Sequence, residues 1–132
     1  MVRAVATFRV VLQREVRDKA LSLLGLVRHL SAVEAWFHAY DGRPDHHYFW
    51  DYVPGARNSA DVTVARADDD LDAYLASVAR SRAAVAGRGL DDRNPGEPHT
   101  LRWIYLHMIE EYARHNGHAD FLRERIDGTT GE

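Results

Sequence analysis

Apolar side chains recur at helical spacing in several parts of the chain. Residues 20–40 are the clearest case, because their large apolar residues fall three or four positions apart. The members of this set are Leu23, Leu26, Leu30, Val33 and Phe37. Such spacing lets a helix bury one side against a core. We therefore expect a helix over most of this segment.

A second helix is expected over residues 70–86. Three consecutive aspartates at 68–70 lie at its start, near the positive N-terminal end of its dipole. Gly87 and Gly89 are expected to stop it. Its inward side chains are expected to be Leu71, Tyr74, Leu75 and Val78.

A third helix is expected from Thr100, a suitable N-cap, to about Ile126, with Gly128 at its end. With side chains placed about 100° apart around the axis, one apolar stripe follows the helix. Its members are Leu101, Ile104, Met108, Tyr112, Ala119, Leu122 and Ile126. His115 falls inside this stripe and Glu111 on its edge, whereas Glu110 lies outside.

The remaining segments carry weaker signals. Residues 41–64 contain two glycines and two prolines and predict a long loop, and loops of this length are often functional. Residues 2–17 could form a helix or a strand. No strand signal competes strongly elsewhere, so we expect one all-α domain over residues 1–132, an antiparallel helical bundle.

Composition narrows the function classes. The chain has 132 residues, is 45% hydrophobic and 28% charged, and has a formal net charge of −3. No apolar run approaches a membrane span, and no basic cluster interleaved with aromatics suggests a nucleic-acid partner. The absence of cysteine excludes disulfides and cysteine-based zinc sites, and it fits a cytoplasmic location.

Three inward polar residues predict a metal site. A carboxylate beside a core is costly unless it is paired or bound to a cation, and Glu111 and His115 are neighbours on one helix face. His29 lies on the inner side of the first predicted helix, between Leu26 and Val33. Two imidazoles and one carboxylate suit Zn²⁺ with an open position, although Fe²⁺ and Ni²⁺ accept the same ligands.

Simpler interpretations of these residues stay open. His29 could be a satisfied core histidine, and the Glu111–His115 pair could be a salt bridge. His118 could support the site from behind or lie on the surface. His38, His99 and His107 are not expected to be ligands, whereas Trp36 and Trp103 are expected in the core. Loop residues 46–50, HHYFW, could form a pocket wall or a lid.

From Ser22 onward the chain resembles the DinB-like superfamily, which includes mycothiol-dependent maleylpyruvate isomerase and the bacillithiol and mycothiol S-transferases. The matching motifs are SLLGLVRHL (22–30), ARSRAAVAG (79–87) and LRWIYLHMIEEYARHNGHADFLRERIDG (101–128). The resemblance implies a four-helix bundle with a divalent metal held by three side chains. In the isomerase branch the middle ligand is Glu, which places the ligands at His29, Glu111 and His115.

One departure from the family pattern affects the fold. Only 21 residues precede SLLGLVRHL, and they do not resemble the usual opening of the family. The first helix is therefore expected to be short, replaced or supplied by a partner chain. Because fewer residues bury less apolar surface, we expect a homodimer.

The resemblance implies a metal-dependent S-transferase that uses a low-molecular-weight thiol such as mycothiol. The thiol would attack a small electrophile, with Zn²⁺ as the first choice of metal and Ni²⁺ or Fe²⁺ as alternatives. A cation favours the thiolate, and a chain without cysteine needs a thiol from outside. A metal-dependent hydrolase or isomerase without thiol is one alternative. A non-enzymatic bundle with a structural metal, or none, is another.

Overall fold

The computed structural model describes residues 22–41, 67–93 and 98–131. They form the helices α2 (Leu23–Val33), α3 (Ala35–His38), α4 (Ala67–Ala84) and α5 (Leu101–Asp127), with a 3₁₀ turn, η1 (Ala39–Asp41), after α3. The described residues contain no strand, only an isolated bridge between Arg93 and Thr100. The all-α class is thus confirmed, but a fourth long helix is not among the described residues. The prediction for residues 2–17 lies outside them, and so does the predicted loop at 41–64 except for Asp41, which ends the 3₁₀ turn.

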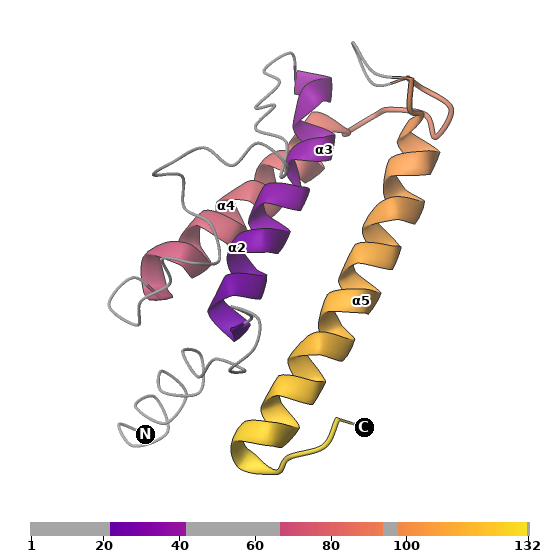
Figure 1. Cartoon of the computed structure of the whole chain (residues 1–132). Helices are drawn as coiled ribbons and strands as arrows, with labels where there is room; N and C mark the ends of the chain where they lie inside the picture. The colour runs from indigo at the N-terminus through magenta and orange to yellow at the C-terminus, as the bar shows by residue number, and fades with distance from the viewer. Residues whose placement is uncertain (1–21, 42–66, 94–97, 132) are drawn as a thin grey trace.

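The first predicted helix is divided at Glu34. Ser22 caps α2, because its side chain accepts a hydrogen bond from the Gly25 N–H at 3.0 Å. At the other end, the Phe37 N–H bonds to the Glu34 carbonyl at 3.0 Å, three residues back rather than four. This tighter 3₁₀-type bonding interrupts the α-helix without changing the direction of the chain (Figure 1).

α4 begins three residues earlier than predicted, at Ala67, so the aspartates at 68–70 lie inside its first turn. The predicted inward face was also wrong in part, because Leu75 is 61% exposed. Small and polar side chains form the buried face instead: Ala67, Asp70, Ser81 and Ala84. The Ser81 hydroxyl donates to the Glu34 carbonyl, and the Ser77 hydroxyl donates to that of Ser31. α4 thus packs on α2 through short side chains.

α5 agrees with its prediction. The Thr100 side chain accepts a hydrogen bond from the Trp103 N–H at 3.3 Å, and Gly128 ends the helix with a φ of 76°. A residue with a side chain would be strained at that positive φ. Its buried side chains are Leu101, Ile104, Met108, Glu111 and Leu122. The predicted stripe is therefore the face that α5 turns to the core.

α2 lies between α4 and α5 and contacts both (Figure 1). Arg28, early in α2, contacts Asp70, early in α4, whereas Glu34, after the end of α2, contacts Ser81, late in α4. The two helices therefore run parallel. Among the described helices, α5 runs antiparallel to α2, so the antiparallel arrangement that we expected holds for α2 and α5 but not for α2 and α4. The main core joins α2, α3, η1, α4 and α5 through Val33, Phe37, Tyr40, Ala84, Leu101, Ile104 and Met108. None of the described helices is long and apolar enough to cross a membrane.

Candidate metal centre

Two antiparallel helices bring the three predicted site residues together. The Oε2 atom of Glu111 lies 3.3 Å from Nε2 of His29 and 3.2 Å from Nε2 of His115. One nitrogen or oxygen atom from each of the three side chains lies within 4.8 Å of the others. In the described part of the chain, no other group of three His or acidic residues has this geometry. Two imidazole nitrogens and one carboxylate oxygen match the donor set of an open zinc site.

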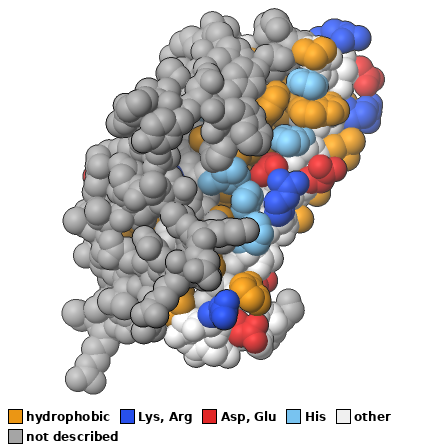
Figure 2. Space-filling view, in the orientation of Figure 1, with side chains coloured by type: hydrophobic (Ala, Val, Ile, Leu, Met, Phe, Trp, Pro, Cys, Tyr) orange, Lys and Arg blue, Asp and Glu red, His pale blue; other side chains and the backbone are white. Residues whose placement is uncertain are grey.

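The site is largely shielded from water. The side chains of His29, Glu111 and His115 are 18%, 10% and 11% exposed. The two imidazole rings meet edge to face, with their centroids 4.2 Å apart. Figure 2 shows histidine side chains on the described part of this face, with acidic and basic side chains beside them. The three side chains therefore converge at a mostly buried point, in the way that metal ligands do.

Burial and neighbouring charges set the protonation states. Burial lowers the pKa of His29, and the hydrogen bond to Glu111 opposes this only partly. Burial and the nearby His29 likewise lower the pKa of His115. Burial would raise the pKa of Glu111, but hydrogen bonds from His29 and Arg114 outweigh it and leave this pKa below its ordinary value. At neutral pH the site thus presents neutral imidazoles and a carboxylate, the forms that bind a cation.

A separate aromatic cluster holds His99 and His107. The ring of Trp103 is stacked between them, with centroid distances of 3.8 Å to His99 and 5.0 Å to His107. Trp36 of α3 meets all three rings edge to face. Trp103 is 38% exposed, so its expected place in the core was wrong. This cluster joins α3 to the N-terminal end of α5, and neither histidine belongs to the three-residue group.

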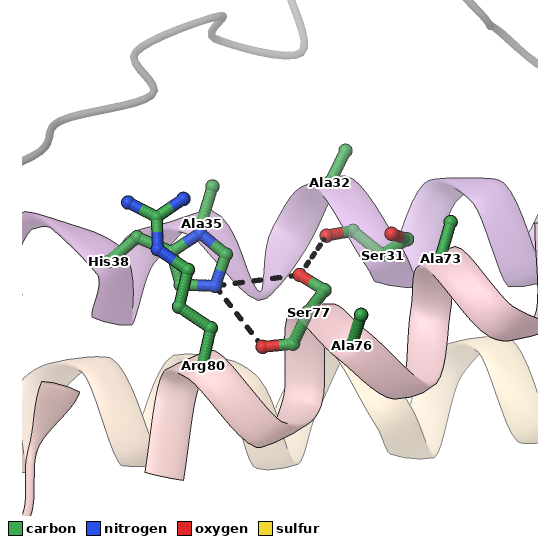
Figure 3. A pocket seen from close by; sticks show the side chains of 8 residues that line it. All are labelled: Ser31, Ala32, Ala35, His38, Ala73, Ala76, Ser77 and Arg80. Carbon is green, nitrogen blue, oxygen red and sulfur yellow. Dashed lines mark hydrogen bonds between the residues drawn. The ribbon is translucent and has the colours of Figure 1, made fainter. Parts of the chain in front are cut away.

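His38 has a partner on α4. Its Nε2 lies 3.2 Å from the Ser77 carbonyl and 3.5 Å from the Ser77 hydroxyl (Figure 3). These residues line a shallow hollow of about 390 Å³ between α2, α3 and α4, whose other walls are mostly alanines. His38 therefore has a hydrogen-bonding partner on α4, and it is not part of the three-residue group. The candidates at positions 46–50 lie outside the described residues.

Two buried polar pairs were not predicted from the sequence. Arg28 is buried, and its Nε donates to Asp70 Oδ2 at 2.7 Å. On α5, the Tyr112 hydroxyl donates to the buried carboxylate of Glu34 at 2.6 Å. Burial, reinforced by that hydrogen bond, raises the pKa of Tyr112 far above its ordinary value. The sequence offers little signal for these pairs, since their partners lie 42 and 78 positions apart.

Comparison with known proteins supports the resemblance. No curated protein and no solved structure matches the chain. The family model described as mycothiol-S-transferase matches residues 10–128, and so it begins before Ser22, where we placed the start of the resemblance. This match covers most of the chain, including the helices that carry His29, Glu111 and His115. The chain therefore belongs to the mycothiol S-transferase family, which is a DinB-like family.

Proposed function

We propose that this protein is a metal-dependent S-transferase that joins mycothiol to a small electrophile. The observation that carries the proposal is the convergence of His29, Glu111 and His115 in a chain of this family. A divalent cation held by these residues would favour the thiolate form of a thiol that it binds, and the thiolate is the nucleophile. Zn²⁺ is our first choice of metal, with Ni²⁺ and Fe²⁺ as alternatives.

The residues of the chain have distinct tasks in this proposal. The two imidazoles and Glu111 supply one donor atom each. The carboxylate would also offset part of the charge of a divalent cation. Their burial excludes water, which strengthens the attraction between the cation and an anionic sulfur. In the reaction, the thiol proton passes to solvent, a carbon–sulfur bond forms, and the leaving group departs with its electron pair.

The ligand set can be tested through metal content. We expect about one equivalent of Zn, Ni or Fe per chain in the purified protein, lost in Glu111→Gln and in His115→Ala. Glu110→Gln is the matched control, because Glu110 is the neighbouring carboxylate and is exposed. Equal metal content in the Glu110 and Glu111 variants would overturn the assignment.

The activity needs its own assay. Conjugation of mycothiol to a haloarene should depend on both the thiol and the metal, and Glu111→Gln should abolish it. Equal rates after removal of the metal would refute the proposal. Turnover that needs the metal but no thiol would indicate a hydrolase or isomerase instead. If the metal changes the stability of the protein but no reaction is found, the protein would be a non-enzymatic bundle with a structural metal.

We also propose that the described helices belong to a single DinB-like four-helix bundle and that the protein is a homodimer. Large apolar side chains on the described surface support both ideas, since such side chains are often covered by another element or by a partner. They include Leu75, Leu106 and Ile109, which are 56–64% exposed. Light scattering at micromolar concentration should give the mass of two chains, and a stable monomer would contradict the dimer.

A further inference from the structure

The two oxygens of Glu111 have different surroundings. Oε2 faces the imidazoles of His29 and His115, as described above. Oε1 accepts a hydrogen bond from Nη1 of Arg114 at 2.5 Å. Charge-assisted bonds of this kind are short and directional, so Arg114 fixes the rotation of the carboxylate about its last torsion. One oxygen is thereby held by the guanidinium, and the other is aimed at the point where the imidazoles meet.

His115 has a similar support. Its Nε2 faces Glu111, whereas its Nδ1 lies 3.3 Å from Nδ1 of His118. One of these two nitrogens must carry a hydrogen for the contact to be a hydrogen bond. If Nε2 of His115 binds a cation, its ring hydrogen is on Nδ1, and His118 accepts it. A partner of this kind sets the tautomer and the ring orientation of a metal-binding histidine.

The two supports repeat along one helix. Glu111 is held by the residue three positions later, Arg114, and His115 is held by the residue three positions later, His118. Residues three apart are neighbours on a helix surface, so each contact needs only the local geometry of α5. Arg114 and His118 are exposed, whereas Glu111 and His115 are shielded, so the two contacting residues lie on the solvent side of the candidate ligands.

We propose that Arg114 and His118 are positioning residues that orient Glu111 and His115 towards a divalent cation. This inference rests on the proposed function, because it assumes that the site holds a metal. Arg114 has a further consequence, since by occupying Oε1 it leaves Glu111 one free oxygen for the cation. The protein then supplies three donor atoms rather than four, which leaves a position open for the thiol.

Metal titration of the purified full-length protein tests this role. We expect Arg114→Ala and His118→Ala each to weaken Zn²⁺ binding roughly 10- to 100-fold, measured by competition with a chelator. Arg114→Lys keeps the charge but not the fork of donors and should recover only part of the affinity. Arg123→Ala is the matched control, because Arg123 is an exposed arginine on the same helix, 3.8 Å from Asp127.

Two further measurements distinguish a role of Arg114 in orienting Glu111 from a contribution of Arg114 to the stability of the fold. Unfolding of the metal-free protein should be nearly the same in the Arg114 and Arg123 variants, because both side chains are more than half exposed. In the Co²⁺-loaded protein, Arg114→Ala should weaken the visible absorption bands, because a freed Oε1 raises the coordination number.

The outcomes distinguish the two proposals. Wild-type affinity and an unchanged Co²⁺ spectrum in both the Arg114 and His118 variants would overturn the positioning role, even if the protein transfers thiols. A wild-type protein that binds metal with this pattern but transfers no thiol would overturn only the proposed function. A wild-type protein that binds no metal would overturn both.

Discussion

The buried ion pair between α2 and α4 gives a quantitative prediction for stability. The side chains of Arg28 and Asp70 are only 4% and 1% exposed, and they join two helices that meet mainly through short side chains. We expect Asp70→Ala to be strongly destabilising, because it leaves the guanidinium buried without its carboxylate. Removal of one partner from a buried pair costs about 3–5 kcal/mol.

The same pair can be replaced with little loss. The charges lose hydration on burial, so a buried pair is often no more stable than apolar side chains of similar volume. We therefore expect the double variant Arg28→Met/Asp70→Leu to lie within about 1 kcal/mol of the wild type or above it. In a domain of this size, a loss of 3–5 kcal/mol lowers Tm by roughly 10–20 °C.

Urea and thermal unfolding of the metal-free protein, followed by helical circular dichroism, measure both effects. Asp72→Ala is the control, because Asp72 is an exposed acid on the same helix and should change stability by no more than about 0.5 kcal/mol. The reasoning is refuted if Asp70→Ala is as stable as Asp72→Ala. It is also refuted if the double variant is less stable than Asp70→Ala alone.

Three further predictions concern single positions. Gly117→Ala should stabilise the protein by about 1 kcal/mol in urea unfolding, because Gly117 is exposed inside α5 and an added Cβ meets no atom within 4 Å. Ser22→Ala should cost about 1 kcal/mol in the same assay, through the lost cap of α2, and an unchanged midpoint would contradict the cap. Burial and the nearby Asp92 raise the pKa of Tyr40 above its ordinary value of 10.0. The unfolded chain therefore loses this proton first, so stability should fall as pH rises above 10, and less steeply in Tyr40→Phe.

Helix α5 was predictable because its signals are local. Its N-cap, its terminal glycine and the period of its apolar side chains are properties of neighbouring positions, and all three agree with the structure. The same period placed Glu111 and His115 at the buried face. The exposure of Trp103 was also visible in this pattern, because its position lies well away from the apolar stripe. The expectation that a tryptophan belongs in the core was therefore the weaker argument.

Helix α4 shows where such reasoning fails. We expected Leu71, Tyr74, Leu75 and Val78 to face inward. Leu75 is exposed and the other three are only partly buried, because the fully buried positions are those where Asp70 pairs with Arg28 and Ser81 bonds to the Glu34 carbonyl at the end of α2. Hydrophobic periodicity does not detect a face that packs through short and hydrogen-bonded side chains. To predict which face of α4 is buried, one must know which residues of the neighbouring helix it contacts, and these are 42 or more positions away in the sequence.

The separation of the candidate ligands along the chain links metal supply to folding. His29 and Glu111 are 82 positions apart, so a cation bound to both would act as a reversible cross-link that closes a long loop. Unlike a disulfide, this cross-link stabilises the fold in proportion to the logarithm of the free metal concentration, by about 2.7 kcal/mol at a hundred times the Kd. Metal starvation would then lower the amount of folded protein as well as its activity.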